Sequence, residues 1–263
     1  MRDRSPRKIN VLGIDVSVMR VDKAVNISME LLRSKGVCVI CFLSAVASLL
    51  CQNEEEAAEY VRSCQLILPG DQHIEMAARN QHETGKTMEG IGEFADNYLK
   101  RLLSRLNRDR CSIYAITGQP ERLTSMEEYI RDSYKNIQFQ GGVLLKETKG
   151  EADRVVNEIN ACIPDIVFVC LPAEHQIKFM EKHAAMMNTR LCILIESIQP
   201  LIRKETEEIP SWIEALHLSG IYHWFKGEEK IRNTIAGSLF KKKVKNEVIE
   251  QDSETEKQDS EKE

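Results

Sequence analysis

The sequence lacks the signatures of several common nucleotide-binding and catalytic sites. It contains no P-loop G-x-x-x-x-G-K-[ST], no G-x-G-x-x-G of a dinucleotide site and no H-E-x-x-H of a zinc protease. It also contains no Asp-x-Asp, so the chain offers no obvious carboxylate pair for a metal bound to a diphosphate. These absences argue against the P-loop NTPases, the dehydrogenases that carry the glycine fingerprint, and the zinc proteases.

Long apolar runs are also missing. The longest, such as residues 166–171 and 192–195, are far shorter than the roughly 20 apolar residues that a membrane-spanning helix needs. Residues 1–8 carry charge, but no apolar signal region follows them. Hydrophobic residues make up 42% of the 263 residues, which suffices for the core of one large domain with appendages. We therefore expect a cytoplasmic protein.

The eight cysteines show no metal-ligand pattern. Most of them lie in apolar runs, where a free cysteine packs as a small hydrophobic residue. Cys38 and Cys41 have the C-x-x-C spacing, but residues three apart in a strand point to opposite faces, and no second Cys/His pair stands at zinc spacing. We interpret the cysteines as structural and expect no bound metal and no cofactor.

The clearest pattern is an alternation of strands and helices in the middle of the chain. A buried strand over 111–117 leads into a loop at Gly118 and a helical pattern, and a buried strand over 166–171 leads into a loop at Pro172 and another helix. This alternation predicts an α/β, Rossmann-like fold, with a mostly parallel sheet and helices on both faces. Ligands of such folds bind outside the carboxyl ends of the strands, so these two loops are the first candidates for function.

The amino-terminal half continues this pattern. Residues 9–16 predict a short hairpin or a bent edge strand. Residues 37–42 predict a buried strand, residues 54–63 a helix and residues 66–68 a short strand. We expect a loop over 69–73, again at the carboxyl end of a strand.

The carboxyl-terminal part differs in composition from the rest. Residues 229–245 are amphipathic and basic, with apolar side chains such as Leu239 and Phe240 opposite a lysine run. Two interpretations stay open: a helix that packs on the domain, and a C-terminal helical appendage that contacts a membrane surface or a partner. Residues 246–263 are acidic and almost free of apolar residues, so we expect a disordered, solubilising tail.

The order and spacing of several short motifs resemble one family, the WecG/TagA/CpsF glycosyltransferases, over about residues 9–234. No motif is intact, and the resemblance depends on the whole set. The segments that carry it are 11–16 (V-L-G-I-D-V), 67–71 (I-L-P-G-D), 117–121 (T-G-Q-P-E), 134–137 (Y-K-N-I), 159–169 and 212–222.

The resemblance implies a reaction, a division of the chain into segments and a contact with the membrane. Members of the family transfer N-acetylmannosamine or a related sugar from a UDP donor to a polyprenyl-diphosphate-linked acceptor, in making cell-envelope polysaccharide or teichoic acid. For this chain it implies a metal-independent, inverting transfer from a UDP-sugar to an undecaprenyl-diphosphate-linked acceptor, with no nucleic acid as partner. It implies a glycosyltransferase domain over 7–228, the appendage over 229–245 in peripheral contact with the inner face of the plasma membrane, and the tail over 246–263. Whether the chain forms a homo-oligomer stays open.

The resemblance also suggests catalytic residues. The catalytic Asp of the family falls on Gly70, so Asp71, one place later, is the candidate base that takes a proton from the acceptor hydroxyl. His73 is a second candidate, because an imidazole titrates near neutral pH. The structural alternative for both is a polar turn, since Pro-Gly-Asp is an ordinary turn sequence.

Five further residues are candidates for substrate binding. By resemblance, Gly118 and Gln119 approach the phosphates or uracil of the donor, Gln176 orients the donor, Gly92 keeps the glycine of a family motif, and His223 contacts a phosphate. Purely structural roles are the alternative to substrate binding. Gly118 can be a glycine that the turn requires, and Gln176 can be an exposed residue in the first turn of a helix.

The chain departs from the family at several functional positions, and this supports a second hypothesis. The residues at these positions are Ala45, Gly70, Phe94 and Ile177. A protein that kept the fold and lost the transfer chemistry would act as a binding or assembly partner in the same pathway. Titration with UDP and the sugar nucleotide, with and without an acceptor, separates the two hypotheses.

Overall fold

The computed structural model describes residues 6–80, 92–145, 150–196 and 236–245. The predictions that concern His223 and the tail over 246–263 lie outside these residues. None of the helices within the described ranges is both long and apolar enough to cross a membrane.

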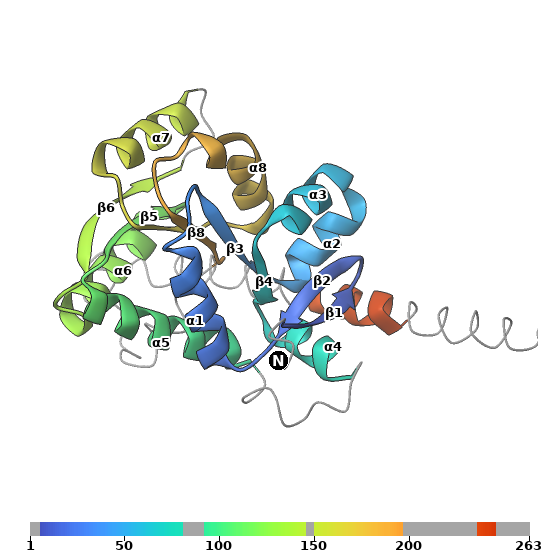
Figure 1. Ribbon diagram of the computed structural model, residues 1–263. Helices are drawn as coiled ribbons and strands as arrows, with labels where there is room; N and C mark the ends of the chain where they lie inside the picture. The colour runs from blue at the N-terminus through green and yellow to red at the C-terminus, as the bar shows by residue number, and fades with distance from the viewer. Residues whose placement is uncertain (1–5, 81–91, 146–149, 197–235, 246–263) are drawn as a thin grey trace, which may run out of the picture.

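A six-stranded parallel sheet forms the centre of the molecule (Figure 1). Its strand order is β4-β3-β8-β7-β5-β6, and every neighbouring pair is parallel. The predicted α/β, Rossmann-like fold is confirmed. The strands are β3 (Cys38–Leu43), β4 (Leu66–Pro69), β5 (Ser112–Thr117), β6 (Gln138–Leu144), β7 (Ile166–Cys170) and β8 (Leu191–Leu194).

Helices cover both faces of this sheet. One face packs against α2 (Ala45–Asn53), α3 (Glu55–Ser63), α4 (Gln72–Asn80), α7 (Glu151–Cys162) and α8 (Ala173–His183), which a short 3-10 helix η1 (Ala184–Met186) follows. The other face packs against α1 (Val21–Leu31), α5 (Phe94–Asp109) and α6 (Pro120–Ser133). In Figure 1, α7 and α8 lie above the sheet and α1 and α5 lie below it.

Strand periodicity explains this layering. Successive side chains of a strand point to opposite faces, so an all-apolar strand supplies two cores at once. In β3, Cys38 and Ile40 join the core with α1, α5 and α6, while Val39 and Cys41 join the core on the other face. The predicted divergence of Cys38 and Cys41 is thus confirmed. All eight cysteines are free thiols.

A hairpin lies beside the sheet as a separate two-stranded unit. Strands β1 (Arg7–Val11) and β2 (Ile14–Val18) pair antiparallel, as the sequence predicts. The turn places Leu12 and Gly13 at positive φ, and the N–H of Gly13 donates to Asn10 Oδ1 at 3.0 Å. The hairpin contacts β4, α3 and α4.

The sequence patterns do not predict helices α2 and α4, and they predict a loop over 69–73. In the structure β3 leads directly into α2, and Asp71 is followed at once by α4. The missed signals are Ser44 and Asp71, two residue types that favour the N-cap of a helix. The loop after β4 is therefore much tighter than predicted.

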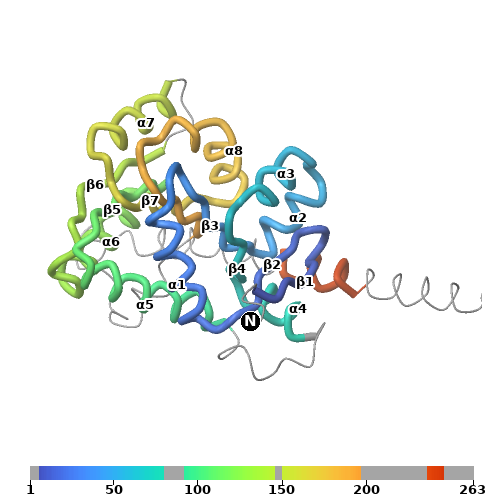
Figure 2. The backbone as a smooth tube through the Cα atoms, viewed as in Figure 1, coloured from blue at the N-terminus to red at the C-terminus, as the bar shows by residue number. Residues whose placement is uncertain are grey.

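The C-terminal segment 236–245 is helical and packs on the domain, as Figure 2 shows by its red colour next to the hairpin. Phe240 is buried, and Lys243 Nζ donates a hydrogen bond to Gln52 Oε1 of α2. The sequence grouped Leu239 with Phe240 on one apolar face. This grouping is wrong, because Leu239 is 52% exposed while Phe240 is 2% exposed.

Glu75 of α4 joins this helix to the start of α5. Its carboxylate accepts the N–H of Gly92 at 2.7 Å and that of Phe94 at 3.2 Å, and the residue is 1% exposed. Burial raises the pKa of the Glu75 carboxyl, and the two N–H groups oppose that rise in part. The sequence did not single out Glu75.

We predict that Glu75→Gln changes the pH dependence of stability. Because the folded pKa lies above the unfolded one, the folded state takes up this proton at higher pH, so wild-type stability rises as pH falls through the folded pKa. The neutral variant lacks this rise. Urea unfolding at a series of pH values from about 7 down to the ordinary glutamate value of 4.5 should show the free energy of unfolding of the wild type rising relative to that of the variant. The exposed Glu93→Gln is the control, and a constant difference between wild type and Glu75→Gln would contradict the prediction.

Candidate functional site

The carboxyl ends of the strands form one edge of the sheet, where ligands of open α/β folds bind. The strand order has a switch point at this edge. Strands β5 and β7 are neighbours, yet α6 after β5 packs on one face and α8 after β7 packs on the other. The helices diverge there, and Gly118 and Leu171 flank the switch point.

The carboxylate of Asp71 caps two helices at once. Its Oδ1 accepts the N–H of His73 at 2.9 Å and that of Ile74 at 3.0 Å, which caps α4. Its Oδ2 accepts the N–H of Ala45 at 2.7 Å, at the start of α2. A carboxylate has about four acceptor directions, so within the described part of the chain the three N–H groups leave one direction of Oδ2 free. Asp71 therefore holds the ends of β3 and β4 together and still presents one acceptor.

Gly70 allows this contact, because the chain passes directly over β3. The N–H of Gly70 donates to Leu43 O at 2.8 Å. A Cβ at this position would lie 2.8 Å from Leu43 O and 2.8 Å from the carbonyl atoms of Phe42. Real side chains do not tolerate such distances to backbone atoms. An aspartate cannot stand at position 70 of this chain unless β3 or the loop moves.

His73 lies under the C-terminal helix. Its ring centre is 6.5 Å from that of Phe240, and a Cβ on Gly237 would lie 2.4 Å from His73 Nε2. Its Nδ1 is buried and has no hydrogen-bond partner among the described residues. Segment 236–245 thus covers the imidazole that the sequence proposed as a second base. That role stays a prediction, and this packing argues against it.

The sequence did not identify Glu196 and Ser44, which also meet at the carboxyl edge. Ser44 Oγ caps α2 by accepting the N–H of Ala47 at 3.0 Å, and it donates a hydrogen bond to Glu196 Oε1. Arg122 of α6 donates to the carbonyl oxygen of Glu196 at 3.4 Å. The signal in the sequence is the position of Glu196, a charged residue two places after the end of the buried strand β8.

The loops at the switch point contain the predicted donor-side residues. Gly118 and Gln119 are exposed, and the nearest atom to a Cβ on Gly118 would be Leu171 Cδ2 at 3.7 Å. Gln119 is the N-cap of α6 and Pro172 the N-cap of α8, and neither side chain caps its helix. Two helix N-termini without side-chain caps therefore flank the switch point, whereas Asp71 and Ser44 fill those of α2 and α4.

The remaining predicted residues lie elsewhere. Gln176 is 3% exposed, and its Nε2 donates to Val169 O of β7 at 2.6 Å, so this amide holds α8 to the sheet. The sequence alternative of an exposed residue is wrong. Gly92 has a φ of 78° and binds Glu75. Their substrate-binding roles stay predictions.

No group of three or more His, Cys, Asp or Glu side chains within the described ranges could hold a metal ion. The polar groups of the carboxyl edge are instead the Asp71 and Glu196 carboxylates, the Arg122 guanidinium and the exposed backbone of the Gly118 loop.

Fold and site together define a class of protein: a doubly wound α/β protein with free helix N-termini at a strand-order switch point, which suits a phosphorylated ligand. Within this class, the chain belongs to the family described as Glycosyl transferase WecG/TagA/CpsF, whose match covers residues 9–240. This confirms the resemblance seen in the sequence motifs. Glycosyltransferases act on a sugar donor and an acceptor. Comparison with curated proteins gave no match.

We predict that Gly70→Ala destabilises the protein. The added Cβ clashes with the backbone of β3, and overpacking of this kind costs about 1–3 kcal/mol. Urea unfolding measures the loss. Gly118→Ala is the matched control, because its nearest neighbour lies at 3.7 Å and the variant should keep wild-type stability. Equal stability of both variants would show that the loop after β4 relaxes freely.

Proposed function

We propose that the protein transfers an N-acetylmannosamine-type sugar from a UDP donor to a polyprenyl-diphosphate-linked acceptor in cell-envelope polysaccharide or teichoic-acid synthesis. The observation that carries the proposal is the pair of uncapped helix N-termini, of α6 and α8, at the switch point of a chain that belongs to a glycosyltransferase family. The sugar, the donor and the acceptor are inferred from the motif resemblance.

The donor diphosphate belongs at the switch point in this proposal. Free N–H groups at a helix N-terminus and the helix dipole both favour an anion. The exposed backbone at Gly118 permits close approach, and Arg122 in the first turn of α6 supplies positive charge nearby. The N-termini of α2 and α4 are unsuitable, because the Asp71 carboxylate already occupies them.

The acceptor hydroxyl belongs on the β3–β4 side, next to Asp71. In an inverting transfer the acceptor oxygen forms a bond to the anomeric carbon, the bond from that carbon to the diphosphate breaks, and UDP leaves. The acceptor proton needs a base within hydrogen-bond reach. Asp71 has one free acceptor direction on Oδ2, and its three backbone N–H bonds keep it in place.

The second hypothesis, a family member without transfer chemistry, has its own support. The position of the family's catalytic Asp is Gly70, where a side chain does not fit. Asp71 is also engaged as a double helix cap. A protein of this kind would bind the sugar nucleotide and assemble with other proteins of the pathway without turnover.

We predict that Asp71→Asn separates catalysis from structure. Asparagine keeps one oxygen that can cap α4, so the fold should survive with a loss of about 1 kcal/mol for the N–H of Ala45, which the amide NH2 cannot accept, whereas the lost base should lower kcat at least about 100-fold. Asp71→Ala should in addition lower the free energy of unfolding by about 1 kcal/mol. UDP release from UDP-N-acetylmannosamine in the presence of a polyprenyl-diphosphate acceptor measures turnover, and calorimetric titration with UDP measures binding.

The wild-type result decides between the hypotheses. Turnover that Asp71→Asn abolishes, with UDP affinity unchanged, supports the transferase. UDP binding without turnover supports the non-catalytic protein. Failure to bind UDP or the sugar nucleotide would overturn the proposed donor site.

We also propose that segment 236–245 contacts an anionic membrane surface. One side of this helix packs on the domain through Phe240, and the opposite side exposes Leu239 with three lysines, Lys241, Lys242 and Lys245. An exposed apolar side chain among lysines suits the interface of an anionic leaflet. A lipid-linked acceptor would be reached from such a surface.

We predict that replacing Lys241, Lys242 and Lys245 with Gln weakens membrane binding. Each lysine near an anionic surface contributes about 1 kcal/mol, so the partition coefficient should fall at least about tenfold. Co-sedimentation with phosphatidylglycerol–phosphatidylcholine vesicles measures it. The control replaces three exposed lysines elsewhere, which are Lys35, Lys135 and Lys182. Equal loss in both triple variants, or no binding by the wild type, would contradict the membrane role.

A further inference from the structure

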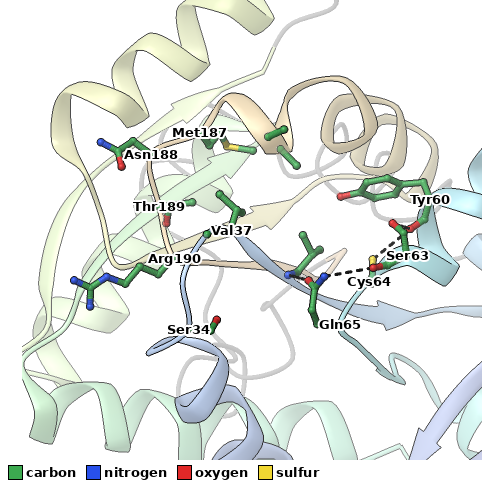
Figure 3. Close-up of a pocket in the computed structure, with 14 residues that line it drawn as sticks. Ser34, Val37, Tyr60, Ser63, Cys64, Gln65, Met187, Asn188, Thr189 and Arg190 are labelled. Atoms are coloured by element: carbon green, nitrogen blue, oxygen red, sulfur yellow. Dashed lines mark hydrogen bonds between the residues drawn. The ribbon is translucent and has the colours of Figure 1, made fainter.

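A pocket lies at the amino edge of the sheet, away from the candidate active site. It encloses about 710 Å³ and is lined by residues at the ends of α1 and α3, by η1, and by the chain that enters β3 and β8 (Figure 3). This volume is in the range of small-molecule sites. A strand of six residues separates the two edges, or about 20 Å at the usual rise per residue. The pocket is thus distinct from the donor and acceptor sides.

The hydroxyl of Tyr60 has no hydrogen-bond partner in this pocket. Tyr60 comes from α3, and its oxygen is buried without a partner among the described residues. Figure 3 shows the ring directed from one end of the pocket toward its centre. A buried hydroxyl without a partner destabilises a fold, so such groups call for an explanation. A ligand that accepts the hydroxyl hydrogen would satisfy this group.

Several polar groups of the pocket lining are already hydrogen-bonded within the protein. Ser63 Oγ donates to the carbonyl oxygen of Tyr60 at 2.6 Å, and Cys64 Sγ lies 3.7 Å from the same oxygen. Gln65 Oε1 accepts the N–H of Val39 at 2.6 Å. Among the described lining residues, the hydroxyl of Tyr60 is the buried side-chain group that has no partner.

The charge of the lining is positive. Arg190 is the one charged side chain among the described lining residues, and it is 62% exposed. Its nearest carboxylate oxygen, Asp165 Oδ1, is 3.9 Å away, and exposed ion pairs of this length contribute little. The other oxygen of Asp165 accepts the N–H and the hydroxyl of Ser112, at 2.8 and 2.9 Å. Arg190 is therefore available to an anion at the mouth of the pocket.

Apolar side chains connect these two polar ends. Val37, Val39 and Met187 line the pocket, and Figure 3 shows Val37 and Met187 between Tyr60 and Arg190. We propose that this pocket binds a small organic anion, whose acceptor group reaches Tyr60, whose body lies on the apolar wall, and whose negative charge pairs with Arg190. This is a second ligand site, at the opposite edge of the sheet from the proposed sugar transfer.

Cys64 provides a reporter for this site. It is half-buried and lines the pocket, while Cys162, also half-buried, lies outside it, and the other six cysteines are buried. Iodoacetate and iodoacetamide both alkylate a thiolate with loss of iodide, but only iodoacetate is an anion. The folded protein is alkylated, and peptide mass spectrometry then gives the rate at Cys64 for each reagent. The ratio of the two rates therefore reports whether the pocket favours an anionic reagent over a neutral one.

We expect Arg190→Gln to lower the iodoacetate-to-iodoacetamide ratio at Cys64 by up to about twofold at low ionic strength, because Arg190 lies at the other end of the pocket and salt screens its charge. The ratio at Cys162 should stay unchanged. Citrate and UMP should slow alkylation of Cys64 in the wild type, and uridine, which lacks the charge, should not. Tyr60→Phe should weaken the protection and also raise the Tm of the ligand-free protein, because it removes the hydroxyl without a partner.

Three results would overturn the proposal. They are a ratio at Cys64 that does not respond to Arg190→Gln, protection by neither citrate nor UMP, and failure of both reagents to reach Cys64 in the folded protein. Asp71→Asn, at the opposite edge, is the control variant and should leave the Cys64 ratio and its protection as in the wild type. A loss of UDP turnover in that variant would leave this site unaffected, so the two proposals fail independently.

Discussion

The double helix cap made by Asp71 is the constraint on which the carboxyl edge depends. One carboxylate accepts N–H groups from α2 and α4, and it therefore joins the ends of β3 and β4. Such charge-assisted bonds are stronger than those between neutral groups. The close approach at Gly70 brings the carboxylate into place, since a side chain there would meet the backbone of β3. The same side chain, Asp71, is therefore both the cap that holds the edge together and the proposed catalytic base.

The same arrangement divides the edge into two parts. On the β3–β4 side, Asp71 and Ser44 fill the helix N-termini, so little capacity for a further anion remains. At the switch point between β5 and β7, the N-termini of α6 and α8 have no side-chain cap. In the proposed function, the anionic donor lies in the second part and the acceptor hydroxyl in the first. The pocket at Tyr60 belongs to the opposite edge, where the helices end and the strands begin.

Much of the fold could be predicted from the sequence, because most strands of the sheet are apolar runs; β6, with two glutamines and two glycines, is the exception. Helices α2 and α4 could not be predicted from periodicity, since α2 is short and continues directly from β3. Their N-caps, Ser44 and Asp71, are visible in the sequence, but serine and aspartate are equally common in turns, so these residues do not by themselves predict a helix. The site was less predictable. Gln176 bonds to the backbone of β7, and Glu75 and Glu196 gain their partners only when distant segments meet.

By itself, the sequence determined the fold class, the two loops at the carboxyl ends of β5 and β7, and membership of a glycosyltransferase family. These properties follow from local periodicity and motif spacing. Only the tertiary structure decided that Asp71 is a double cap, that a side chain at position 70 is excluded, and that segment 236–245 covers His73. The physical reason is that each of these facts is a contact between segments far apart in the chain, at distances that no local pattern encodes.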